Sequence, residues 1–428
     1  MLRVFWSNIL LFSILFFILY EKAFVAFVVG SGIKLVDDFL SLIAILLILL
    51  HLTRRLKIRY AILNSPLMYF ILVFFASAVI NMVDLDVVLV QLRSYLLMIG
   101  LYYLIVFKNL TNSDLLKIVK IICIFSIPII ASAYIEYYTG RNLIVEFDRY
   151  GIAFSEKDIR RVYTLIGNPI DYANYIALIS IIFISSLSSK LKLFNFSKFS
   201  SVALLLLIIV SLFFANSRGA VIALIGTILF AALYLNLISK ARVLIYILLA
   251  IVFMIVFEVN FISRLLQFNF EAFENDKYRI LFLIKSIEVF LDNPFIGVGP
   301  GRFGGWVSIN YSESDIYTMY NFTTDKISSI DMFFPHLIGE LGLLGFWAYL
   351  MFFIKPFLCY LKVLKREYSK VARFFSLIPV LMIPMLFLMG WFSISLETQV
   401  IFGMYMLLLG ISEKYLENEN IRRTISGK

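Results

Sequence analysis

The stretch from 199 to 239 contains a single charged residue, Arg218, in an otherwise apolar run. A transmembrane helix needs about 20 apolar residues, so this stretch predicts two membrane spans that meet at Asn216-Ser217-Arg218-Gly219. A charged side chain at bilayer depth costs about 2.5–3.5 kcal/mol on insertion scales and usually marks a polar cavity or a functional site. Arg218 is therefore the first candidate functional residue of the chain.

The whole chain has the composition of a polytopic membrane protein. Of its 428 residues, 62% are hydrophobic and only 15% are charged, and the mean hydropathy is +0.94. Soluble domains are about one quarter charged. The two cysteines and two histidines are too few for a disulfide framework or for a thiolate or histidine metal cluster. The sequence thus predicts no metal site and no cofactor.

Hydropathy predicts an all-α polytopic membrane protein with about 12 transmembrane helices. The whole chain, 1–428, is expected to form a single transmembrane domain, because no internal repeat or separate soluble region interrupts the pattern. The predicted spans lie near 5–20, 34–51, 66–82, 87–107, 118–137, 170–188, 200–216, 219–238, 242–258, 332–354, 374–392 and 398–412.

The distribution of basic residues predicts the orientation of these spans. Alternate short loops and both ends of the chain carry more than half of the 38 Lys and Arg residues but few of the 28 acidic ones. Such loops face the cytoplasm, so both termini are expected to be cytoplasmic. The net charge of +10 then faces anionic membrane lipids and does not indicate nucleic acid as a partner.

This orientation places two long loops, about 138–169 and about 259–331, on the extracytoplasmic side. Loops of that length within a compact domain are usually functional. The first one ends in IRRVYTLIGNPIDY, where Arg160 and Arg161 precede a Gly167-Asn168-Pro169 turn at the start of a span. These arginines are candidate anion ligands, but a basic residue near an interface also extends to lipid headgroups without any catalytic role.

The second loop contains an expected amphipathic helix followed by a glycine-rich turn. Apolar residues recur at helical spacing over 278–291, and Arg279 opens this predicted helix. The turn that follows, GVGPGRFGG, contains Arg302 but lacks the lysine of a P-loop and the strand of a dinucleotide fold. We therefore interpret its glycines as packing residues.

The next predicted span begins with DMFFPHLIGELGLLG and holds the candidate bases. His336 and Glu340 are one helical turn apart and share a face, whereas Asp331 is separated from them by a proline. A histidine at the entrance of a span is more often a hydrogen-bonded interfacial residue than a base. The two neighbouring carboxylates favour a catalytic role for Asp331 or His336.

Five arginines thus belong to segments expected on the outward side. Arginine is a planar, permanently charged, bidentate donor for phosphate. If these side chains converge, they would suit a lipid diphosphate and stabilise the charge that develops on it as a leaving group, while a nearby carboxylate or imidazole would deprotonate an attacking hydroxyl. The five residues are Arg160, Arg161, Arg218, Arg279 and Arg302.

Four segments, taken in order, resemble motifs of the O-antigen polymerase and O-antigen ligase family of bacterial envelope enzymes. They are Arg161 ahead of Gly167-Asn168-Pro169, then Ser217-Arg218-Gly219-Ala220, then Arg279 ahead of Pro294 and Gly297-Val298-Gly299-Pro300-Gly301, and finally Glu340-Leu341-Gly342-Leu343-Leu344-Gly345. Ligases of this family usually carry a histidine nine residues before the glutamate, where this chain has Asp331. An aspartate at this position is more similar to the polymerase branch of the family.

The resemblance implies a metal-independent, inverting glycosyl transfer from undecaprenyl diphosphate on the outer face of the bacterial inner membrane. In a polymerase the acceptor is another lipid-linked repeat unit, with Arg161, Arg218 and Arg279 on the diphosphate and Asp331 or His336 as the base. It also implies a chain-length regulator and a flippase as candidate partners. Two alternatives stay open: a ligase that transfers the glycan to lipid A-core, and a transporter or flippase of lipid-linked sugars.

Overall fold

The computed structural model describes residues 61–141, 143, 161–235, 272–310, 316–320, 332–366 and 369–419, together with a few positions between 13 and 23. Within these ranges the chain consists of helices and turns, without a strand. The all-α fold class is therefore confirmed for this part of the chain. The spans predicted near 34–51 and 242–258 lie outside it.

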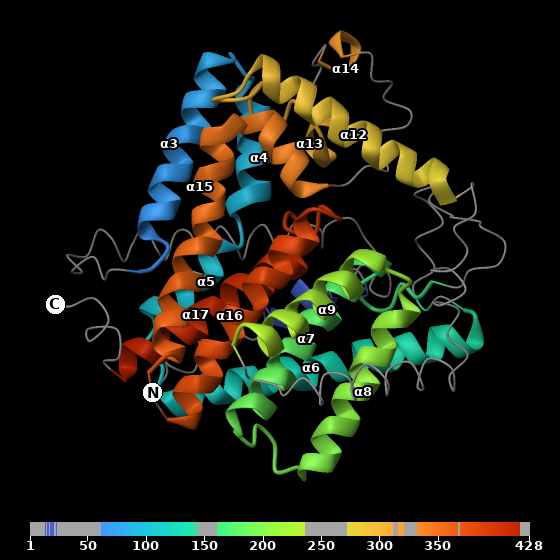
Figure 1. Ribbon diagram of the computed structural model, residues 1–428, viewed down its shortest axis with the longest axis vertical. Coiled ribbons are helices and arrows are strands. Elements are labelled where there is room, and N and C mark those ends of the chain that lie inside the picture. Colours follow the sequence, from blue (N-terminus) through green and yellow to red (C-terminus); the bar gives the residue numbers. More distant parts are fainter. Residues whose placement is uncertain are drawn as a thin grey trace.

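The helices are labelled in Figure 1. Their bounds are α3 Asn64–Ile80, α4 Leu85–Leu96, α5 Ile99–Phe107, α6 Asn112–Thr139, α7 Pro169–Ser189, α8 Lys198–Phe214, α9 Arg218–Leu233, α12 Ala272–Asp292, α13 Gly305–Asn310, α14 Ile316–Met319, α15 Phe333–Leu364, α16 Lys370–Gly390 and α17 Gln399–Asn418.

Several of these helices are long and apolar enough to cross a membrane. Among the described residues, α6, α7, α15 and α16 meet that criterion, and α4 with α5 forms a fifth candidate as a pair bent by 52°. The apolar helices α3, α8 and α9 are shorter. The chain is thus a membrane protein, while the total of about twelve spans stays a prediction.

The helix starts follow from local sequence signals. Thr111 and Asp114 form a reciprocal capping box at the start of α6, the arrangement that satisfies two unpaired backbone amides at once. At the start of α7, the Asn168 side chain accepts hydrogen bonds from the amides of Ile170 and Asp171, with Pro169 in the first helical position. The Gly167-Asn168-Pro169 turn therefore starts a helix, as predicted.

Helix α16 lies at the centre of the described bundle, where it packs against α7, α9, α15 and α17. In Figure 1, α12 runs to the right from beside the upper ends of α4 and α15, with α13 below it, and α6 to α9 fill the lower part. In the C-terminal part of α17, the buried Glu413 accepts hydrogen bonds from the Ile62 amide (2.9 Å) and from the Tyr102 hydroxyl. This carboxylate fixes α17 to the start of α3 and to α5.

The span predicted over 87–107 is divided into two helices at Leu97 and Met98. Helix α5 packs along α17, whereas α4 carries Tyr95 to a hydrogen bond with Glu340 of α15. The 52° bend between α4 and α5 thus separates a half that contacts α15 from a half that packs on α17. Hydropathy alone does not distinguish a bent pair from a straight span.

Helix α15 is interrupted at Gly342, whose backbone has φ 61° and ψ −162°. Around this break the chain exchanges backbone hydrogen bonds with the segment after α12. The amides of Leu343 and Leu344 donate to the carbonyls of Pro294 and Phe295 at 2.8 and 3.1 Å, and two amides from 298–299 donate back to the carbonyls of Gly339 and Glu340 at 3.1 and 2.9 Å. The break therefore joins the glycine-rich turn directly to the motif around Glu340.

Replacing Gly342 with alanine is expected to destabilise the protein by about 3 kcal/mol. A Cβ atom there would lie 2.5 Å from the Phe295 carbonyl carbon, and this backbone conformation is itself strained by about 1–3 kcal/mol for other residues. The measurement is thermal unfolding in detergent. Gly403→Ala is the control, because its added Cβ would meet the flexible Met98 sulfur at 3.2 Å and the side chains of Ile18 and Leu101 at an ordinary contact distance of 3.5 Å. Equal melting temperatures for both variants would contradict the prediction.

Candidate functional site

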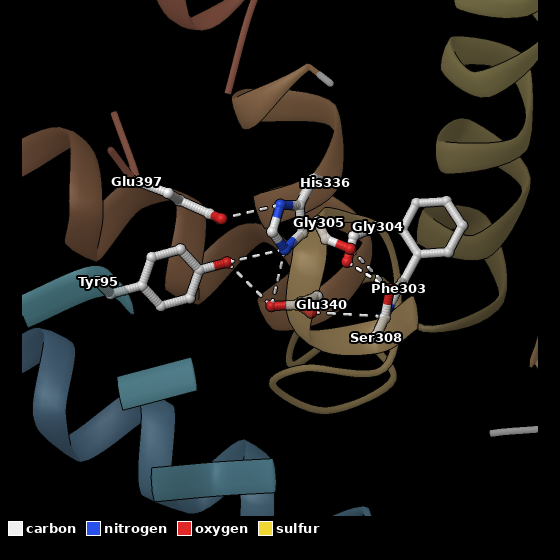
Figure 2. A network of polar contacts seen from close by, with 8 residues as sticks. All are labelled: Tyr95, Phe303, Gly304, Gly305, Ser308, His336, Glu340 and Glu397. Carbon is white, nitrogen blue, oxygen red and sulfur yellow. Dashed lines mark hydrogen bonds and ion pairs between the residues drawn. The ribbon is translucent and has the colours of Figure 1, made fainter. Parts of the chain in front are cut away.

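The first turn of α15 holds His336 in a buried polar network (Figure 2). Its Nε2 lies 3.1 Å from the Tyr95 hydroxyl oxygen and 3.1 Å from Glu340 Oε2, and its Nδ1 lies 3.1 Å from Glu397 Oε1. The side chains of His336, Glu340 and Glu397 are 1%, 0% and 7% exposed. Two helices, α4 and α15, and the loop before α17 thus bring four polar side chains together inside an apolar bundle.

Glu340 is the most firmly held member of this network. The Tyr95 hydroxyl donates to its Oε2 at 2.9 Å, and the Phe303 amide donates to its Oε1 at 3.4 Å. Its position one turn after His336 places both side chains on one face of α15, as the spacing predicts. A buried carboxylate is costly unless it is paired and hydrogen-bonded, and Glu340 meets both conditions.

The contact on the Nδ1 side of the His336 ring differs from the contacts on the Nε2 side. Nδ1 of His336 and Oε1 of Glu397 are close enough for an ion pair, yet neither atom has a hydrogen-bond partner with suitable angles among the described residues. Attraction between a cationic ring and a carboxylate does not depend on that angle. We therefore interpret this contact as electrostatic.

The glycine-rich turn forms a wall against the imidazole. A Cβ atom at Gly305 would lie only 2.7 Å from Cε1 of His336, so no larger residue fits there without displacing the ring. Ser308, in the first turn of α13, donates from its hydroxyl to the carbonyl of Gly304 at 2.6 Å. These glycines thus serve packing, in line with the sequence interpretation.

Arg161 lies in a segment that other elements hold firmly. The amide of the next residue, Val162, donates to the carbonyl of Phe214 at the end of α8 (3.3 Å). Since Arg218 begins α9 only a few residues after Phe214, the structure brings the Arg161 segment to the turn that precedes Arg218. Both side chains are half-buried.

The structure describes a side-chain contact for only one of the other three predicted arginines. Arg302 donates from its guanidinium to the carbonyl of Met82 at 3.3 Å. Arg279 lies in the interior of α12, which begins at Ala272, so it does not open the helix as the sequence suggested; the position of its side chain lies outside what the structure describes. Arg160 and Asp331 lie outside the described residues altogether.

The loop between α16 and α17, residues 391–398, connects these regions. Its Phe392 contacts the start of α9, since a Cβ atom at Gly219 would lie 2.7 Å from Cβ of Phe392. Its Ser393 carbonyl accepts the Phe333 amide at the start of α15 (3.3 Å). The same loop carries Glu397, so it links the neighbourhood of Arg218 to that of His336.

Sequence reasoning missed three residues that organise the site: Tyr95, Glu136 and Glu397. Both glutamates stand in largely apolar segments, IIASAYIEYYTG and MGWFSISLETQVIFG, and the isolation criterion that singled out Arg218 also applies to them. Tyr95 gives no such signal, because tyrosine is common in membrane helices. The described residues include no group of three or more His, Cys, Asp and Glu side chains arranged to hold a metal ion.

Glu136 fixes the backbone beside Arg161. Its Oε2 accepts the amides of Tyr163 (2.8 Å) and Thr164 (2.9 Å), and its Oε1 accepts the amide of Leu143 (3.0 Å). The residue is 3% exposed, so this buried carboxylate satisfies three amides from the predicted outward loop. Thr164 needs this support, because its φ of 58° lies in the left-handed region.

Replacing Glu136 with alanine is expected to destabilise the protein by about 2–4 kcal/mol, because leaving a buried amide without an acceptor costs about 1–3 kcal/mol. Glu136→Gln is the matched control and should lower the free energy of unfolding by roughly half as much, since it keeps one acceptor oxygen. Unfolding in detergent measures both. The assignment is wrong if alanine and glutamine variants unfold at the wild-type temperature.

These features define a helical membrane protein with a buried polar site at the broken start of an apolar helix. Residues 203–350 match the family model described as O-Antigen ligase, which confirms the resemblance to the O-antigen polymerase and ligase family. The matched segment includes Arg218, Arg279, His336 and Glu340. It indicates an O-antigen ligase or polymerase type of function, carried out by glycosyltransferase-like enzymes. A comparison with curated proteins gave no match.

Proposed function

We propose that this protein polymerises undecaprenyl-diphosphate-linked repeat units into an envelope polysaccharide on the outer face of a bacterial inner membrane. The observation that carries the proposal is the meeting of the motif segments. The Arg161 segment bonds to the end of α8 just before Arg218, and the glycine-rich turn bonds to α15 around Glu340. Segments that are far apart in sequence thus adjoin one another.

The arginines have the chemistry to bind a lipid diphosphate. A guanidinium donates two parallel hydrogen bonds to phosphate oxygens and stays charged at any physiological pH. Arg161, Arg218 and Arg279 would hold the diphosphate and stabilise the negative charge that develops as it leaves the sugar, with Arg160 and Arg302 as further candidate ligands. Transfer by this route requires neither a nucleotide nor a metal ion.

The acceptor hydroxyl needs a base, for which the sequence offers Asp331 and His336. The contacts of His336 favour a different role. An imidazole flanked by carboxylates at both nitrogens is stabilised in its protonated form, and an imidazolium has two donors and no lone pair. Asp331 is then the remaining candidate from the original pair.

A ligase is the second candidate, since the matched family model carries that description. Both candidates share the diphosphate-binding arginines and differ in the acceptor. The replacement of the ligase histidine by Asp331 favours the polymerase.

Deleting the gene distinguishes these functions through the products that accumulate. Loss of a polymerase leaves single repeat units on the acceptor, whereas loss of a ligase leaves long polymer on the carrier lipid. The proposal of polymerisation fails if the deletion strain still makes long chains. Reconstituted protein that moves lipid-linked sugar across vesicles without joining units would instead identify a transporter.

A further inference from the structure

We propose that Glu397, in place of the sequence candidates Asp331 and His336, is the catalytic base that takes the proton from the acceptor hydroxyl, and that His336 is a fixed cation that orients it. The inference rests on the proposed glycosyl transfer and adds a residue that neither the sequence motifs nor the family match, which ends at residue 350, includes. It follows from the contacts of the three ionisable side chains, taken one at a time.

The first step concerns the protons of His336. The Tyr95 hydroxyl donates to Glu340 Oε2, so its oxygen accepts from Nε2–H of the ring, 3.1 Å away. Nδ1 faces a carboxylate oxygen at 3.1 Å. A neutral Nδ1 would place its partial negative charge against a carboxylate oxygen at that distance, and an imidazole binds a proton more tightly than a carboxylate does. Both ring nitrogens therefore carry protons, and the ring cannot accept another.

The second step compares the two carboxylates. Glu340 is fully buried, and its oxygens already accept hydrogen bonds from Tyr95 and Phe303. The Glu397 side chain is the most accessible of the three, at 7%. Charge attraction holds it, and within the described part of the chain its Oε1 accepts no hydrogen bond with suitable angles. Glu397 is thus the network member able to receive a proton.

The third step concerns location. Glu397 lies in the loop 391–398, whose Phe392 contacts Gly219, the residue after Arg218. The loop is also fixed from α7, where the Asn174 amide donates to the hydroxyls of Ser393 (3.3 Å) and Ser395. A base at 397 is therefore carried by the same anchored loop that adjoins the proposed diphosphate ligand Arg218.

The reaction balances without any further reagent. The acceptor oxygen forms a bond to the anomeric carbon of the donor sugar as the bond from that carbon to the diphosphate oxygen breaks. The diphosphate leaves with the bonding electron pair, next to the arginines. The hydroxyl proton passes to the Glu397 carboxylate and is later released to water, while His336 keeps both of its protons throughout.

The test uses the full-length protein in lipid vesicles with the lipid-linked repeat unit extracted from the deletion strain. Glu397→Gln is expected to lower kcat at least 100-fold, the lower end of what a general base contributes, with KM changed less than about 3-fold. Glu417→Gln, a change elsewhere in the same C-terminal region, is the matched control and should keep wild-type activity. Gel filtration and thermal unfolding verify that both variants are folded.

Chemical rescue separates a base from a structural residue. Glu397→Ala is expected to regain at least 10-fold activity when formate is added, because a small carboxylate can occupy the space of the missing one. Glu397→Asp, which keeps the carboxylate, should retain the acid limb of the pH–kcat profile even where the glutamine variant is poorly folded. A lost rate without formate rescue, or an unchanged acid limb in Glu397→Gln, overturns the assignment.

The same assay distinguishes failure of this inference from failure of the proposed function. Wild-type protein that joins repeat units while Glu397→Gln keeps more than one third of its kcat rejects Glu397 as the base and leaves the polymerase standing. Wild-type protein that joins no units rejects both.

Discussion

An Arg218→Ala chain is expected to lose envelope polymer almost completely at normal expression. Arg218 begins α9 beside the Arg161 segment, and in the proposed mechanism it stabilises the diphosphate as that group leaves. Removing one such electrostatic donor costs about 100- to 1,000-fold in kcat in other acyl-transfer and hydrolytic enzymes. The measurement is the chain-length distribution of the envelope polysaccharide, together with kcat in reconstituted vesicles.

Two variants control this prediction. Arg218→Lys keeps the charge but loses the bidentate geometry, so it should restore only part of the activity. Arg373→Ala removes an exposed arginine near the start of α16 and should leave polymer formation unchanged. Full-length polymer in a folded Arg218→Ala strain would contradict the diphosphate-binding role.

Replacing His336 with leucine is expected to abolish activity and to destabilise the protein by about 3–5 kcal/mol. Removing one partner of a buried ion pair leaves the other charge uncompensated. Here two carboxylates, Glu340 and Glu397, would both lose the cation that lies 3.1 Å from each of them. Unfolding in detergent at matched protein concentration measures the loss.

A double-mutant cycle tests whether this cost comes from the ion pair or from packing. The single variants His336→Leu and Glu340→Leu are compared with the variant that carries both. Because the double variant leaves one fewer uncompensated charge, it should be less destabilised than the sum of the single changes by more than about 1 kcal/mol. Strict additivity would indicate that the network is held together by shape alone.

Much of the fold follows from hydropathy and local helix signals. The apolar runs at 118–137, 170–188, 332–354 and 374–392 correspond to α6, α7, α15 and α16. The Asn168-Pro169 pair begins α7 as expected, and the helix predicted over 278–291 lies within α12. These elements were predictable because their signals are local: apolar length, capping side chains and helical periodicity.

The interruptions of the helices were not predictable in the same way. The bend between α4 and α5 and the break of α15 at Gly342 both depend on distant partners. The Gly342 break is stable because the carbonyls of Pro294 and Phe295 accept the amides that it frees. The sequence around Gly342 does not indicate that Pro294 and Phe295, more than 40 residues earlier, pack against this part of α15.

The candidate site, too, could be predicted from the sequence only in part. Spacing on one helix predicted that His336 and Glu340 share a face, and the structure gives a 3.1 Å contact between them. Tyr95 and Glu397 join them from α4 and from the loop before α17, at separations that no helical period connects. Their presence turns a possible base into a cation, which changes the chemistry assigned to His336.

The sequence alone determined that this chain is a helical membrane protein, which arginines stand out in it and which family it resembles, because burial in lipid and motif order leave direct traces in composition and spacing. Only the tertiary structure decided which charges neutralise one another. A carboxylate acts as a structural anchor, an ion-pair partner or a base according to the donors around it, and those donors come from elements that meet only when the helices pack.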